Sequence, residues 1–140
     1  MEDNQLFNLE LNTDEISFFA TSLSTALESD IATANGFTAE EVLTILINLS
    51  VIRANQSALQ SKEILAALNI AIQGQNRMRQ RLAIHLLLEL IGSSMAKVAI
   101  PETTIFTLQA LKMDSLSDVR SLAHCLLQSL QHQGKYLHVV

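Results

Sequence analysis

Three arginines, Arg77, Arg79 and Arg81, stand at alternate positions at the start of a segment with helical periodicity. Cations at a helix N-terminus oppose the macrodipole at a cost of roughly a few tenths of a kcal/mol each, so a group outside the helix should compensate. Guanidinium groups bind carboxylates and phosphates through paired hydrogen bonds. With Arg53 and Arg120 as candidate neighbours, the pattern predicts an anion-facing patch that binds acidic side chains of a partner, or phosphates. A solvated helix face with one internal ion pair is the alternative interpretation.

Other residue combinations that could do chemistry are few. His124 and Cys125 are adjacent, so on a helix their side chains diverge by about 100° and cannot act together as base and nucleophile. His85 stands 40 residues before Cys125, but both lie beside apolar stripes and are interpreted as packing residues. His124 and His132 lack a third metal ligand at a suitable spacing. Because phosphate-binding, dinucleotide-binding and Cys-x-x-Cys motifs are missing too, the sequence predicts no enzyme, no metal and no cofactor.

Charge is distributed unevenly along the 140 residues, whose net charge is −5. Residues 1–52 hold nine acids and no Lys or Arg, whereas residues 53–140 hold five acids and all nine bases. Such polarity can steer a partner towards one end of a domain. The negative net charge and the low aromatic content, 4%, make a nucleic-acid-binding surface the less favoured function.

Helices must position these side chains, and the composition favours helices. Hydrophobic residues make up 49% of the chain and charged residues 16%, which suits Leu-rich and Ala-rich helices better than β-sheets. Six helices in three hairpins are predicted, with Gly36, Gly74, Gly92 and Gly134 at helix ends. The expected landmarks are Thr13 as first N-cap, a Thr38/Glu41 capping box opening a helix to about Ala54, a third helix from Ser61, a fourth from about Asn76 to Ile91, Pro101 in the first turn of a fifth, and Ser117 as the cap of a sixth that ends near His132. Asn48 and Asn55 are expected as exposed polar positions on the second helix.

An internal repeat with an offset of 40 residues is the most informative pattern. Val42, Leu82 and Leu122 align at this offset, and three further apolar columns follow in the same helices. A period near 40 with two helices per unit is typical of helical-repeat proteins, in which each unit buries its apolar face against its neighbours.

The last unit carries the most specific residues. Asp118, Val119 and Arg120, followed by Ala123 and a leucine ladder, resemble the second helix of a HEAT repeat. Over residues 38–132 the chain is similar to the HEAT/armadillo class. The resemblance implies an all-α fold, a short right-handed α-solenoid of about three two-helix repeats, with Asp118 and Arg120 in a polar ladder between units. A six-helix bundle with accidental self-similarity is the alternative.

We expect a repeat domain over residues 13–134, an acidic, flexible segment over 1–12 and a tail over 135–140. With a single cysteine, no signal peptide and no spanning segment, the expected location is intracellular, in cytoplasm or nucleus. The predicted function is a non-enzymatic protein-protein interaction module that binds an acidic or amphipathic segment. A structural or oligomerisation segment of a larger helical-repeat assembly is the alternative. The predicted partner-binding residues are Arg53, Arg77, Arg79, Arg81, Arg120, Asn48 and Asn55. Reversing the charges of Arg79 and Arg81 together is expected to abolish binding without altering the thermal melt.

Overall fold

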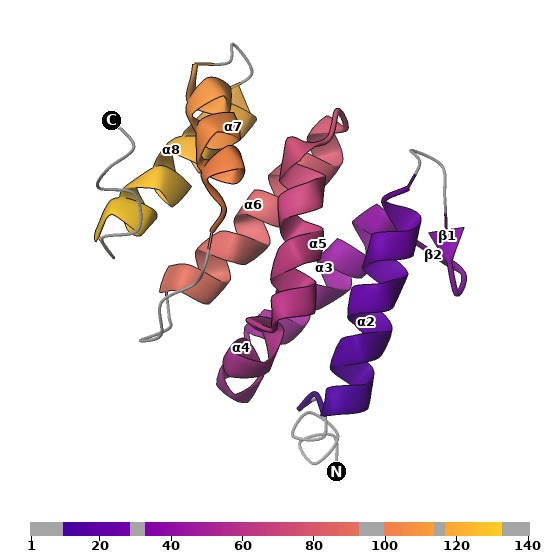
Figure 1. Cartoon of the computed structure of the whole chain (residues 1–140). Coiled ribbons are helices and arrows are strands. Elements are labelled where there is room, and N and C mark those ends of the chain that lie inside the picture. The colour runs from indigo at the N-terminus through magenta and orange to yellow at the C-terminus, as the bar shows by residue number, and fades with distance from the viewer. Residues whose placement is uncertain (1–9, 29–32, 93–99, 114–116, 133–140) are drawn as a thin grey trace.

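A computed structural model describes residues 10–28, 33–92, 100–113 and 117–132. Within these ranges the chain forms seven helices and one short hairpin (Figure 1). The elements are α2 (Thr13–Ala26), β1 (Thr33–Ala34), β2 (Phe37–Thr38), α3 (Ala39–Ser50), α4 (Arg53–Leu59), α5 (Lys62–Gln73), α6 (Arg77–Gly92), α7 (Glu102–Lys112) and α8 (Ser117–His132). The prediction of an all-α protein is confirmed. Most of the predicted acidic segment, the tail and Gly134 lie outside the described residues.

Several helix starts follow the local sequence signals. Thr38 and Glu41 form the predicted capping box: the Glu41 N–H donates to Thr38 Oγ1 at 3.1 Å, and the Thr38 N–H donates to Glu41 Oε1 at 2.9 Å. Ser61 caps α5 as predicted, because its hydroxyl oxygen accepts a hydrogen bond from the Ile64 N–H. These bonds satisfy N–H groups that lack a partner within the helix.

Three predicted helix boundaries are wrong. The N-cap of α2 is Asn12, not Thr13, since Asn12 Oδ1 accepts from the Glu15 N–H. Pro101 is the N-cap of α7, in an extended conformation, rather than a residue of its first turn. The second predicted helix does not continue to Ala54: α3 ends at Ser50 and a separate α4 follows, so the described helices outnumber the six predicted.

The break after α3 has a local cause. The Asn55 Nδ2 group donates to the Leu49 carbonyl at 3.0 Å, and the Gln56 Nε2 group donates to the Ser50 carbonyl at 3.0 Å. Carbonyls in the last turn of a helix have no partner within it. Side-chain amides of α4 therefore satisfy the end of α3, where no glycine is present.

Gly36 lies in a hairpin turn rather than at the end of a helix. Asn35 and Gly36 have φ angles of 56° and 84°, and an Asn-Gly pair with two positive φ angles suits a tight two-residue hairpin. Thr33 pairs with Thr38 across this hairpin, and Asn35 Nδ2 donates to Ser22 Oγ of α2 at 3.0 Å. The hairpin places Phe37 directly before α3.

Six of the helices form three antiparallel pairs, α2 with α3, α5 with α6 and α7 with α8 (Figure 1). These pairs lie side by side, so that α3, α6 and α8 make one row while α2, α5 and α7 make the other. The N-terminal turns of α3, α6 and α8 lie next to each other, as the ion pairs Arg79 to Glu40 and Arg81 to Asp118 require. The row of α3, α6 and α8 is therefore parallel.

The core lies between the two rows. Two of the aligned 40-residue columns are fully buried in all three helices: Leu43, Ala83 and Ala123, and Leu46, Leu86 and Leu126. The side chains of Leu82 and Leu122 are only half-buried against this core. The periodicity read from the sequence thus identifies core positions of α3, α6 and α8.

Candidate functional site

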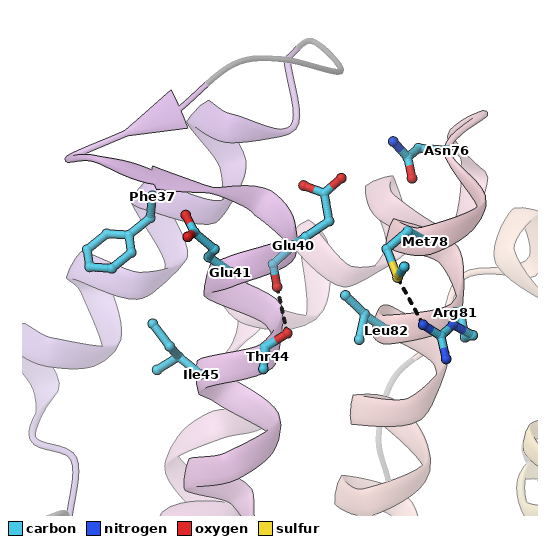
Figure 2. A pocket seen from close by; sticks show the side chains of 9 residues that line it. All are labelled: Phe37, Glu40, Glu41, Thr44, Ile45, Asn76, Met78, Arg81 and Leu82. Carbon is cyan, nitrogen blue, oxygen red and sulfur yellow. Dashed lines mark hydrogen bonds between the residues drawn. The ribbon is translucent and has the colours of Figure 1, made fainter.

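An open groove of about 850 Å³ lies between the N-terminal halves of α3 and α6. Its apolar lining comes from both helices and from the hairpin: Phe37, Ile45, Met78 and Leu82. Its polar lining consists of Glu40, Glu41, Thr44, Asn76 and Arg81. In Figure 2 the side chains of α3 stand on one side of the groove and those of α6 on the other. The groove is thus an apolar channel with charged walls.

Local structure fixes both walls. The capping box with Thr38 holds the Glu41 carboxylate at the first turn of α3, and the hairpin turn sets the position of Phe37. On the opposite wall, Asn76 Oδ1 accepts a hydrogen bond from the Arg79 N–H at 3.0 Å, which caps the start of α6. Both walls therefore begin at capped helix N-termini, and side chains one turn apart line the groove.

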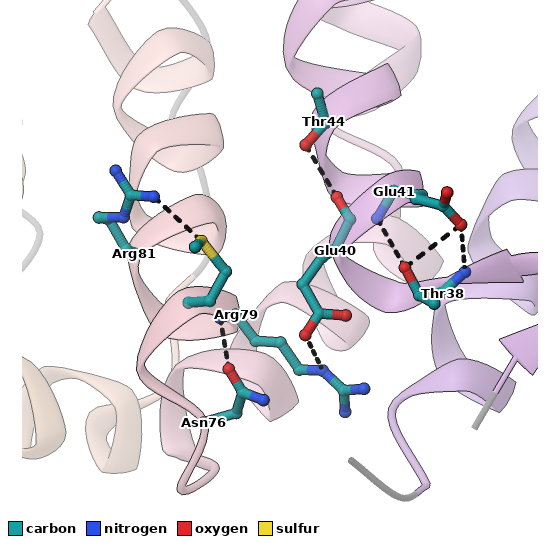
Figure 3. A network of polar contacts seen from close by, with 8 residues as sticks. Thr38, Glu40, Glu41, Thr44, Asn76, Arg79 and Arg81 are labelled. Atoms are coloured by element: carbon teal, nitrogen blue, oxygen red, sulfur yellow. Dashed lines mark hydrogen bonds and ion pairs between the residues drawn. The ribbon is translucent and has the colours of Figure 1, made fainter. Parts of the chain in front are cut away.

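Arg79 is not a surface residue. Its residue exposure is 3%, and its Nε atom lies 3.4 Å from Glu40 Oε2 across the gap between α6 and α3 (Figure 3). Glu40 thus supplies the compensating charge that the arginines at the start of α6 require. Arg79 was predicted to contact a partner, and the structure instead encloses its side chain between helices.

Arg81 stays at the surface and lines the groove. Its Nε atom lies 3.8 Å from Asp118 Oδ2, and one of its terminal nitrogens lies 3.0 Å from the Met78 sulfur. The side chains of Arg81 and Asp118 are 40% and 62% exposed, so this ion pair contributes little to stability. Asp118 does link neighbouring helices, but its partner is Arg81. Arg120, for which a ladder role was also predicted, is exposed on α8.

The other predicted contact residues are scattered. Arg77 and Asn48 are exposed on α6 and α3, and Arg53 is exposed at the start of α4, beyond the far end of α3. Asn55, predicted as exposed, is fully buried: its Oδ1 accepts from the Leu11 N–H at 2.7 Å, while its Nδ2 donates to a carbonyl of α3. Of the predicted set, the groove includes Arg81 alone.

No known family model, characterised protein or solved structure matches this chain. Its function must therefore be argued from its own residues. The groove residues that the sequence patterns did not identify are half apolar and half polar. Met78 is one of them, although it stands within the arginine cluster. The position of Met78 between two arginines in a predicted helix was the sequence signal that could have identified it as a surface residue.

The candidate reactive residues lie at the surface. His85 Nε2 is 3.6 Å from Glu89 Oε2, one turn along α6, and both side chains are nearly half exposed. Cys125 and His124 are exposed on α8. Within the described ranges, no three His, Cys, Asp or Glu side chains gather as a metal site would require, and none of the described helices is long and apolar enough to cross a membrane.

Proposed function

We propose that this protein is a non-enzymatic interaction module built as a short right-handed α-solenoid of three two-helix units, in which the groove between α3 and α6 binds a helical segment of a partner. The parallel row of α3, α6 and α8 supports the solenoid. So does the spacing of its ion pairs: Glu40 and Arg79 are 39 residues apart, and Arg81 and Asp118 are 37 apart, both close to the sequence repeat. Helix α4 is then an inserted connection between the first and second units.

The groove is the observation that carries the binding function. Its lining side chains recur about once per turn on α3 and α6, as in Ile45 after Glu41 and Leu82 after Met78. A helix laid between them presents side chains with the same spacing of about 5.4 Å per turn. Apolar anchors on one face of that helix would cover Phe37, Met78 and Leu82, and the flexible thioether of Met78 suits such contacts.

Polar outer faces support a free module over the alternative of an assembly segment. The exposed residues of α8 include Arg120, Ser121, His124 and Gln128, and those of α2 include Asp14, Glu15, Ser17 and Thr21. Terminal units of helical-repeat proteins have polar outer faces, whereas internal ones need apolar faces on both sides. Within the described residues, the exposed positions of the end pairs are mainly polar, with Phe18 on α2 and Phe106 on α7 as separate exposed apolar side chains.

Size-exclusion chromatography with light scattering is expected to give the monomer mass of 15.4 kDa across a wide range of protein concentrations. The polar ends of the stack are the reason, because association needs buried apolar area. A dimer that persists on dilution would contradict this expectation and favour the assembly alternative.

Groove binding can be tested with a displayed library of random peptides. Selection on the wild-type protein should enrich peptides whose affinity falls about tenfold or more in M78D, because burial of a methionine side chain contributes about 1.5 to 3 kcal/mol. The matched control is I70D: Ile70 is 56% exposed and Met78 47% exposed, but Ile70 lies on α5, away from the groove.

Two results would overturn the proposal: no peptide enriched on the wild-type protein relative to M78D, or equal losses in M78D and I70D. Both variants replace an exposed apolar side chain, so circular dichroism should show similar unfolding curves for both. Loss of binding in M78D alone then reports on the groove.

A further inference from the structure

The groove presents more negative than positive charge to a ligand once the ion pairs within the protein are considered. Arg79 is buried against Glu40, so it cannot reach a ligand in the groove. Arg81 is the one cation in the groove lining, and it lies beside Asp118. Glu40 and Glu41 line the opposite wall, and Glu41 is exposed. Arg79 compensates Glu40 and Asp118 compensates Arg81, so among the described residues that line the groove the exposed carboxylate of Glu41 is the charge left over.

The surroundings of α3 extend this negative charge. Residues 1–52 contain no Lys or Arg, and these residues supply α2, the hairpin and all of α3. Their exposed acids in the described part include Asp14, Glu15, Glu28 and Glu41. A partner that approaches the groove over α3 thus passes exposed acids on a segment of the chain that contains no Lys or Arg. The negative charge of these acids attracts cations over about a Debye length.

We propose that the segment bound in the groove is an amphipathic helix with a row of Lys or Arg along the flank that faces α3. This inference rests on the proposed function and adds the charge of the partner. The apolar face of the helix covers Phe37, Met78 and Leu82, its cations lie against Glu41, and its other flank faces Arg81. Charge complementarity of this kind favours the correct orientation and speeds association.

The inference reverses the acidic partner expected from the arginine cluster. That expectation needed several exposed guanidinium groups facing the groove, but Arg79 is enclosed, Arg77 is exposed without lining the groove, and Arg81 lies near Asp118. An acidic helix in the groove would face Glu40, Glu41 and Asp118. Like charges placed opposite one another at an interface select against such a partner.

The peptides enriched on the wild-type protein, and lost on M78D, provide the test. We expect them to carry apolar residues at helical spacing and a net positive charge. For one such peptide, E41Q should weaken binding about threefold at low salt, in the range of one exposed ion pair, and the loss should shrink as salt is added. Glutamine at this position can still form the capping box, so α3 keeps its start.

Glu15 provides a matched control for Glu41. It occupies the same capping-box position in α2, where Glu15 Oε1 accepts from the Asn12 N–H at 2.9 Å, and it is exposed. E15Q removes the same charge away from the groove, so at the same salt concentration it should weaken binding much less than E41Q.

The outcomes separate the two proposals. Enriched peptides that are acidic or uncharged, or equal effects of E41Q and E15Q, would overturn the cationic partner while groove binding stands. If no peptide distinguishes the wild-type protein from M78D, the groove function fails and this inference fails with it.

Discussion

R79E is expected to destabilise the protein by about 3 to 5 kcal/mol, because removing one partner of a buried ion pair leaves the other charge uncompensated. The new carboxylate would also face Glu40, now 3.4 Å from the guanidinium. A carboxylate in the first turn of α6 gains about 0.3 to 1 kcal/mol from the helix macrodipole, too little to offset this loss. Denaturant unfolding, with stability taken from midpoint and slope, measures the effect.

R81E is the matched control for this prediction. Arg81 stands in the same helix two residues later, but its side chain is 40% exposed, so charge reversal should change stability by less than about 1 kcal/mol. A double replacement, R79M with E40Q, removes both charges and should recover most of the loss seen in R79E. Equal unfolding midpoints for R79E and R81E would show that the ion pair between Arg79 and Glu40 contributes little to stability.

Because R79E is expected to destabilise the protein, the combined charge reversal of Arg79 and Arg81 is no clean test of binding. This differs from the sequence-based expectation of an unaltered thermal melt.

N55A is expected to cost about 2 to 3 kcal/mol, because it leaves buried polar groups without hydrogen bonds. The Leu49 carbonyl would lose its donor, and the Leu11 N–H would lose an acceptor at 2.7 Å. The effect spans two elements, since this side chain joins the end of α3 to the residues before α2. Denaturant unfolding gives the total loss, and hydrogen exchange at the Leu11 amide reports the local one.

N48A is the natural comparison, since Asn48 is exposed on α3. A surface substitution of this kind should remain within about 0.5 kcal/mol of the wild-type stability. If N48A and N55A had the same stability, the hydrogen bonds of Asn55 would not be the reason for its burial.

Asn55 is one example of a wider use of neutral amides. Gln80 Nε2 donates to the carbonyls of Ile72 and Gly74 at the end of α5, at 2.9 and 2.8 Å, and Gln60 Nε2 donates to the Leu90 carbonyl of α6 at 3.0 Å. The last turns of α2, α3, α5 and α6 contain no basic residue. Cations often stabilise such turns. At the ends of α3, α5 and α6, amides from neighbouring elements take that role, which is one reason why a stable helical fold needs so few charged residues.

Much of the fold could be predicted from local patterns. The Thr38 capping box, the Ser61 cap and the end of α8 at His132 agree with the structure. Ser117, predicted as the N-cap of the last helix, is instead the first residue of α8. Caps can be predicted because they depend on residues three positions apart. The buried columns through Leu43 and Leu46 could likewise be predicted, because an apolar stripe recurs every turn. The break before α4 was not, since it depends on side-chain bonds to the preceding helix.

The candidate site could be predicted only in part. Arg81 was expected to contact a partner and does line the groove, whereas Met78 and Phe37 were missed. A groove between two helices needs side chains from both, and no single segment encodes how they face each other. The hairpin residue Phe37 belongs to the wall only because of the positive φ angles at Asn35 and Gly36.

The sequence by itself determined the helical class, several helix starts and the apolar columns of the core, since each depends on spacing within one helix. Only the tertiary structure decided which polar residues face water. Arg79 and Asn55 have unremarkable local sequences, yet one is enclosed by Glu40 and the other by its bonds to Leu11 and Leu49. Burial of a polar side chain depends on the partner that another segment places opposite it, and those partners lie up to 44 residues away.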